Sequence, residues 1–194
     1  MIFSSRTCFG VGMERYGGGA IEVRDYDPRW PTLFDEECSR LRGVFGSMAV
    51  AIEHMGSTSV PGLAAKPIID LLVGVRNLLD AKSLCMEPLR AMGYTHITAY
   101  EAWLPAELFF RKGMPGPWTH HLHVMEPSNP RWEDLLLFRD YLRWHPETAS
   151  AYGSLKKSMA LAFKDDIEGF RNSKHSFVVD VLAKARAERE PVKA

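Results

Sequence analysis

The chain has 194 residues, enough for one domain with a substantial core, and 46% of them are hydrophobic while 25% are charged. Lys and Arg together number 24, as do Asp and Glu, so the formal net charge is zero with His neutral. This balance argues against an extended nucleic-acid surface, and no apolar run is long enough to span a bilayer. The three cysteines are scattered and form no C-x-x-C pair, so we expect reduced thiols and a cytoplasmic protein.

The N-terminal part of the chain contains a loose segment followed by a helix. Residues 1–20 show little hydrophobic periodicity and hold three consecutive glycines, so we expect a flexible leader there. A short strand is predicted over 21–23. Asp27 and Pro28 then open a predicted helix. Its apolar side chains recur at helical spacing, at Trp30, Leu33, Phe34, Cys38 and Leu41.

The middle of the chain carries mainly strand patterns, and the last third carries helix patterns. Strands are predicted over 48–54, 68–75, 94–100, 107–112 and 118–125, with a helix over 78–92 and a turn over 113–117. Helices are predicted over 130–144, 147–163 and 167–189. We therefore predict an α+β fold with a mixed sheet of about five strands, flanking helices and a C-terminal three-helix part. Residues 21–189 are interpreted as a single domain, with a sheet part over 21–128 and a helical part over 129–189.

One carboxylate, Asp70, interrupts an apolar strand that otherwise reads as buried on both faces. A buried ionised carboxylate loses its hydration, which costs several kcal/mol unless a positive or polar group answers it. The partner could be a metal ion, a cation such as Lys66, or backbone N–H groups of a loop. The alternative is an Asp at an exposed strand end, bonded to a turn.

A small, polar loop precedes this strand. Gly56 and the hydroxyls of Ser57, Thr58 and Ser59 can present N–H and O–H donors to an anion with little steric bulk in the way. The spacing is not that of a phosphate-binding G-x-x-x-x-G-K-[ST] loop. An ordinary Ser/Pro/Gly turn between two strands is the alternative interpretation.

Histidines alternate along the strand predicted over 118–125. His121 and His123 share one face about 7 Å apart, which suits two ligands of one metal with Asp70 as a third, or two imidazoles facing a phosphate. A polar strand face that meets solvent is the alternative. Arg111, on the preceding strand, would neighbour this pair in a hairpin and could hold a phosphate or form a surface ion pair.

Lysines interrupt two apolar stripes in the predicted C-terminal helices. Lys156 and Lys174 must snorkel, form ion pairs or face a cleft, and both could enter a pocket beside Asp70. Arg139 and Arg143 lie four residues apart near Asp140, so we expect a solvated face with local salt bridges for that pair.

The stretch GSTSVPGLAAKPIIDLLVGV, over 56–75, resembles the signature of the GrpB family, which belongs to the nucleotidyltransferase superfamily. HHLHV over 120–124, FRDYLRWHPE over 138–147 and the 174–177 segment KHSF extend the resemblance. In that superfamily a Gly-Ser follows the first strand and an Asp-x-Asp lies on the next. Gly56, Ser57 and Asp70 stand at matching positions.

The resemblance implies a nucleotidyltransferase-like domain that binds a nucleotide or another phosphorylated small molecule. The loop over 56–59 would hold phosphate, and four cations, Lys66, Arg111, Lys156 and Lys174, would neutralise it. Asp70, His121 and His123 would hold a divalent metal, Mg²⁺ or Mn²⁺, or orient a hydroxyl. If the domain is catalytic, Asp70 and His123 would act in metal-assisted nucleotidyl or phosphoryl transfer.

One position departs from the superfamily pattern. The second carboxylate, expected two residues after Asp70, is Leu72. Two acids there would hold two divalent cations, which one Asp and one Leu cannot do in that way. The resemblance therefore leaves a second reading, a non-catalytic binding or folding-assistance module for a partner such as dephospho-CoA kinase, to which similar domains are joined. The third and least favoured function is a metal-dependent hydrolase that uses the histidines of the strand predicted over 118–125.

Overall fold

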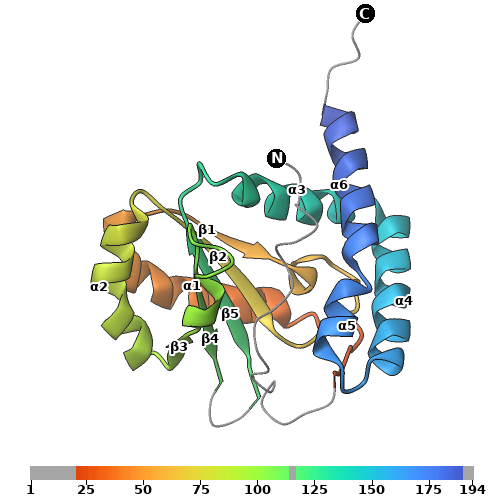
Figure 1. The fold of residues 1–194 in the computed structure, drawn as a ribbon, viewed down its shortest axis with the longest axis horizontal. Coiled ribbons are helices and arrows are strands. Elements are labelled where there is room, and N and C mark those ends of the chain that lie inside the picture. Colours follow the sequence, from red (N-terminus) through yellow and green to blue (C-terminus); the bar gives the residue numbers. More distant parts are fainter. Residues whose placement is uncertain (1–20, 114–116, 190–194) are drawn as a thin grey trace, which may run out of the picture.

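The computed structural model describes residues 21–113 and 117–189, and within them the chain forms one five-stranded mixed sheet (Figure 1). The strand order is β1-β2-β5-β4-β3. The strands are β1 (Ala49–Met55), β2 (Ile69–Val75), β3 (Tyr94–His96), β4 (Leu108–Lys112) and β5 (His120–Met125). The central pair, β2 and β5, is parallel, and the other neighbours are antiparallel. The predicted α+β class and mixed sheet are confirmed.

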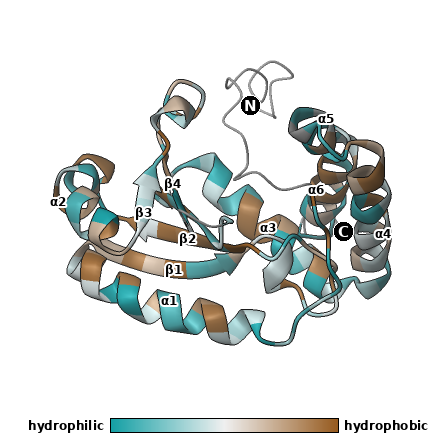
Figure 2. Cartoon of the chain, turned by 90° about the horizontal axis from the view of Figure 1, so that it is seen from below, coloured by the Kyte–Doolittle hydropathy of each residue, from teal (hydrophilic) through white to brown (hydrophobic). Residues whose placement is uncertain are grey.

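Helices cover both faces of this sheet. They are α1 (Trp30–Phe45), α2 (Leu78–Ala91), α3 (Pro130–Trp144), α4 (Pro146–Ala162), α5 (Ile167–Asn172) and α6 (His175–Arg189). The first two pack on one face, and α3 lies against part of the other, while α4, α5 and α6 gather beside the sheet (Figure 1). Hydrophilic and hydrophobic residues alternate along α1, as expected for a helix with one face on the sheet (Figure 2).

Strand β2 carries the core, as its apolar sequence predicts. Every residue of the strand is buried except Asp70, which is partly buried. Leu71 and its odd-numbered neighbours pack against α1 and α2. Leu72 points to the opposite face, where it packs in a cluster with Met55, Met125 and apolar side chains of α3. Asp70 shares this second face because side chains alternate along a strand.

Two predicted strands need correction. Residues 21–23 form no strand, and the backbone instead makes a single antiparallel bridge between Arg24 and Ala65. The strand predicted over 94–100 ends at His96, and a short 3₁₀ turn, Thr98–Tyr100, follows it. The predicted leader over 1–20 and part of the predicted turn over 113–117 lie outside the described residues.

The helix predicted over 167–189 is two helices, α5 and α6, so the helical part contains four helices in place of three. Lys174 therefore lies in the turn between them and not on a helical stripe. The Ser173 hydroxyl donates to the carbonyl of Phe170 at 2.9 Å. A hydroxyl that bonds to a nearby backbone carbonyl competes with helical hydrogen bonds and favours the end of a helix. The hydrophobic periodicity of the sequence does not indicate such an end.

Candidate functional site

The polar loop after β1 turns sharply at Gly56 and makes a 3₁₀ turn, Ser57–Ser59. Gly56 has a φ of 69°, and a Cβ there would come within 2.2 Å of the Asp70 carboxylate. Both the left-handed backbone and this close approach require glycine. The loop backbone therefore lies directly against the one carboxylate of strand β2.

Side chains from distant parts of the chain fix this loop. The Ser59 hydroxyl donates to the Gly56 carbonyl at 2.6 Å, and the Arg143 guanidinium donates twice to the Ser59 carbonyl, at 3.0 and 2.9 Å. Thr58 Oγ1 lies 3.0 Å from His54 Nε2, and burial lowers the pKa of His54 to about 4. Ser59 and Thr58 are thus engaged in holding the loop.

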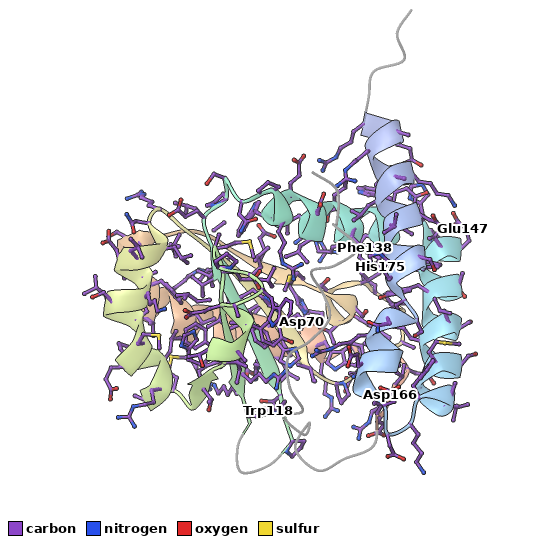
Figure 3. All side chains as sticks on the ribbon, in the orientation of Figure 1. Asp70, Trp118, Phe138, Glu147, Asp166 and His175 are labelled. Carbon is purple, nitrogen blue, oxygen red and sulfur yellow. The ribbon has the colours of Figure 1, made fainter. Side chains whose placement is uncertain are left out.

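A cavity of about 170 Å³ opens beside the loop, between the sheet and the helices α4 and α5. Figure 3 places Asp70 near the centre of the molecule, on the side of the sheet that faces these helices. The polar residues that line the cavity are Ser57, Thr58, Lys66, Asp70, His121, Tyr152, Lys156, Arg171 and Lys174. The structure therefore brings most of the sequence-predicted residues to one place.

Asp70 and His121 form a carboxylate–imidazole pair. They occupy matching positions of the parallel strands β2 and β5, and Asp70 Oδ1 lies 3.1 Å from His121 Nδ1. Burial lowers the pKa of His121, which favours the neutral ring. A neutral ring that donates its Nδ1 proton to Asp70 leaves Nε2 as an acceptor. Within the part of the chain that the structure describes, this Nε2 is buried and has no hydrogen-bond partner.

Lys156 reaches the loop from α4. Its Nζ donates to the Ser57 hydroxyl at 2.6 Å and lies 4.5 Å from the centre of the Tyr152 ring. The residue is only 4% exposed. Burial, followed by repulsion from Lys174, lowers the pKa of Lys156 to about 7. Its sequence neighbour Lys157 is exposed and pairs instead with Asp25 at 2.5 Å.

Two further lysines meet at the ring of Phe170. The Lys66 and Lys174 ammonium groups lie 4.5 and 3.8 Å from its centre. Burial and the neighbouring Arg171 lower the pKa of Lys66 to about 8. Burial, Lys66 and Arg171 lower the pKa of Lys174 to about 7. Each of these lysines is thus more easily deprotonated than a solvated one, mainly because it is buried and further because the neighbouring cations repel it.

Four predicted site residues lie outside the cavity lining: Gly56 and Ser59, which belong to the adjoining loop, and His123 and Arg111. His123 makes a buried pair with Glu107, and Glu107 also accepts from Arg131 Nε at 2.8 Å. Arg111 of β4 lies opposite His121 of β5 in the strand register, as predicted for a hairpin. Its side chain is 4% exposed, and its guanidinium lies over Phe109, 5.4 Å from the ring centre.

Arg171, Tyr152 and Phe170 line the cavity but were not among the predicted site residues. Tyr152 and Phe170 each precede one of these lysines by four residues in the sequence, so the spacing between ring and lysine was the signal that could have identified them. Arg139 was expected on a solvated face, yet it is 9% exposed. It binds Glu53 at 2.7 Å as well as its predicted partner Asp140.

The predicted metal ligands do not converge. Asp70 and His121 bond to each other, and His123 bonds to Glu107. In 21–113 and 117–189, no three His, Cys, Asp or Glu side chains are placed to hold a metal ion. The donor set therefore does not fit a three-ligand site, and Mg²⁺ or Mn²⁺ remains a prediction of the resemblance.

Comparisons with known proteins agree with this fold. A family model described as GrpB protein matches residues 20–184. The "UPF0157 protein YqkA" of Bacillus subtilis is 43% identical over 158 residues, which cover 81% of this chain and 45% of that protein. A crystal structure of the "conserved protein GrpB from Enterococcus faecalis" is 36% identical, with a TM-score of 0.80, over 86% of this chain and 98% of that one.

A further relative is a protein named "Dephospho-CoA kinase" from Mycolicibacterium paratuberculosis. It is 31% identical over 181 residues, which cover 82% of this chain and 44% of the kinase. The chain thus spans less than half the length of this relative and of YqkA. No helix in the described part of the chain is long and apolar enough to cross a membrane.

Proposed function

Because the chain belongs to the GrpB family, and its resemblance to nucleotidyltransferases implies phosphate recognition, we propose that its cavity binds a phosphorylated small molecule. One observation carries the proposal. Lys66, Lys156, Lys174 and Arg171 line a single small cavity, and Asp70 is the one carboxylate among the described lining residues. An anion in the cavity offsets this excess of positive charge.

The lowered lysine pKa values support the same reading. Holding buried ammonium groups close together costs free energy, which is why their pKa values fall toward 7. A bound phosphate restores the charged forms and turns the repulsion into attraction. Ser57 adds a neutral hydrogen-bonding group at the same wall, next to Lys156.

We propose binding in preference to two-metal transfer because of Leu72. This residue is 0% exposed and packs with Met55 and Met125. A two-metal centre needs a second carboxylate at that position, and the side chain there is core. Asp70 is already bonded to His121, which supports a role in orienting the imidazole.

Isothermal titration of the full chain tests the proposal. Inorganic phosphate, ATP, CTP, GTP and UTP are titrated with and without Mn²⁺. We expect heat of binding with at least one phosphate compound, and loss of about tenfold or more in affinity in Lys156→Met, since a desolvated charge contact is removed. Lys157→Met, on the same helix, is the matched control and keeps the affinity. The absence of heat with every compound, in the presence and absence of metal, removes the proposal.

A second candidate is a module that assists a kinase. It is favoured by the relative named dephospho-CoA kinase, of which the matched region forms only 44%. In that case the chain binds a kinase at defined stoichiometry in co-purification, and Lys156→Met and Asp70→Ala leave the complex intact. A metal-dependent product formed from a nucleotide would count against this candidate.

A further inference from the structure

We infer that the ligand of this cavity is a short phosphate monoester that carries a hydroxyl group and no nucleobase. The inference rests on the proposed phosphate binding and narrows its substrate class. Three features of the cavity carry it: its volume, the engagement of its aromatic rings, and the unpaired acceptor of His121.

The volume limits how much of a ligand the cavity holds. It is about 170 Å³. Pockets that bury a drug-sized ligand hold about 300–1,000 Å³. A phosphate with a short polyol or hydroxy-acid skeleton suits the smaller space, whereas a nucleotide would leave most of its base and sugar outside.

The aromatic rings of the lining are already engaged. The Tyr152 ring stacks on Phe177 with ring centres 4.9 Å apart, and Lys156 lies over it at 4.5 Å. The Phe170 ring carries the ammonium groups of Lys66 and Lys174. A nucleobase that stacked on either ring would have to displace a cation or a packed side chain. The wall therefore offers cations to a phosphate, and it offers no ready stacking surface to a base.

The preference for a ligand with a hydroxyl group comes from His121. Asp70 holds the Nδ1 side of the ring, and the buried Nε2 has no partner among the described residues. A buried acceptor left without a donor is destabilising. A ligand hydroxyl that donates to Nε2 removes this cost, whereas a bare alkyl group leaves it in place. Asp70 acts here as a positioning residue, because it fixes which nitrogen carries the proton.

Two matched pairs of probes test the inference by isothermal titration of the full chain. Glycerol 3-phosphate and propyl phosphate differ in their hydroxyl groups, and ribose 5-phosphate and adenosine 5′-monophosphate differ in the base. We expect glycerol 3-phosphate to bind about tenfold more tightly than propyl phosphate, which corresponds to one buried hydrogen bond. We expect adenine to add no affinity to ribose 5-phosphate.

His121→Phe supplies the residue-level check. This variant has an aromatic ring but neither the Nε2 acceptor nor the Nδ1 donor to Asp70, so the ratio between the affinities for glycerol 3-phosphate and propyl phosphate should fall to about one. Equal binding of that pair to the wild-type chain, or tighter binding of the adenosine compound than of ribose 5-phosphate, overturns the inference and leaves phosphate binding standing. Failure of all four probes and of inorganic phosphate overturns both.

Discussion

At the scale of single residues, the backbone of Gly56 lies against the Asp70 carboxylate. Two glycine substitutions separate the effect of this contact from the effect of the backbone conformation. Gly56 and Gly62 both have positive φ angles, of 69° and 77°. A Cβ at Gly56 meets the Asp70 carboxylate, whereas one at Gly62 meets no atom within 4 Å. We expect Gly62→Ala to lower the free energy of unfolding by about 1–2 kcal/mol, the cost of the backbone conformation alone. Gly56→Ala should cost more and also weaken phosphate binding, as measured by chemical denaturation and titration. Equal effects of the two substitutions would contradict the contact.

The buried lysines predict how anion binding depends on pH. Lys156 and Lys174 have pKa values lowered to about 7, and Lys66, Arg171, Asp70 and His121 face them across the cavity. The protonated lysines attract an anion, so a bound anion raises their pKa values and affinity decreases as the pH rises above about 7. Sulfate is the suitable probe because its own charge is constant in this range. We expect its affinity to fall about tenfold or more between about pH 7 and about pH 9, with proton uptake on binding.

The same lysine gives the control for that pH profile. Lys156→Met should flatten the decline, because one titrating group is gone, and Lys157→Met should reproduce the wild-type curve. Titration in two buffers with different ionisation enthalpies measures the proton uptake directly. An affinity that is constant from pH 7 to pH 9 would mean that neither lysine changes charge on binding.

At the scale of elements, α3 is fastened to the end of β1 by Arg139. Its guanidinium donates to Glu53 at 2.7 Å and to the His54 carbonyl at 3.1 Å, and it also pairs with Asp140. We expect Arg139→Met to lower the free energy of unfolding by about 1–3 kcal/mol, because the buried His54 carbonyl loses its donor and the partly exposed Glu53 and Asp140 lose their ion pairs. Arg90→Met, which removes the exposed ion pair with Glu87 on α2, should cost much less, because solvent screens both charges. Denaturant unfolding of both variants measures the difference, and equal costs would contradict a buried role for Arg139.

The sequence predicts the elements well where periodicity and buried runs determine them, as in β2, α1 and α3. It does not locate the break between α5 and α6, because the apolar pattern continues through Ser173, whose hydroxyl bonds to the Phe170 carbonyl where α5 ends. It places Asp70 near Ser57 because the loop leads directly into the strand, and it directs Lys156 and Lys174 towards the same pocket because each interrupts an apolar sequence stripe. It cannot separate His121 from His123, which share a strand face. Their partners, Asp70 and Glu107, come from distant positions, so only tertiary structure assigns one imidazole to the cavity and the other to a buried ion pair.

At the scale of the whole molecule, the sheet part and the helical part share the cavity. Lys156 of α4 binds Ser57 of the loop, and Arg143 of α3 binds the Ser59 carbonyl. We therefore expect the single domain predicted over 21–189 to unfold in one cooperative transition. Circular dichroism and tryptophan fluorescence should give coincident denaturation curves, and sulfate should move the midpoint without splitting it. Two separated transitions would mean that the parts are independent.

The burial of Leu72 has a consequence for how easily the chemistry of this scaffold could change. Its neighbours Met55 and Met125 close over the place where a second acid would sit, with Trp132 of α3 beside them. An aspartate introduced at position 72 would place an unpaired charge in an apolar cluster. One substitution therefore cannot create a two-metal centre. A two-metal centre at this position would require several simultaneous replacements beneath α3, so the packing of Leu72 limits which chemistry this framework can acquire by single substitutions.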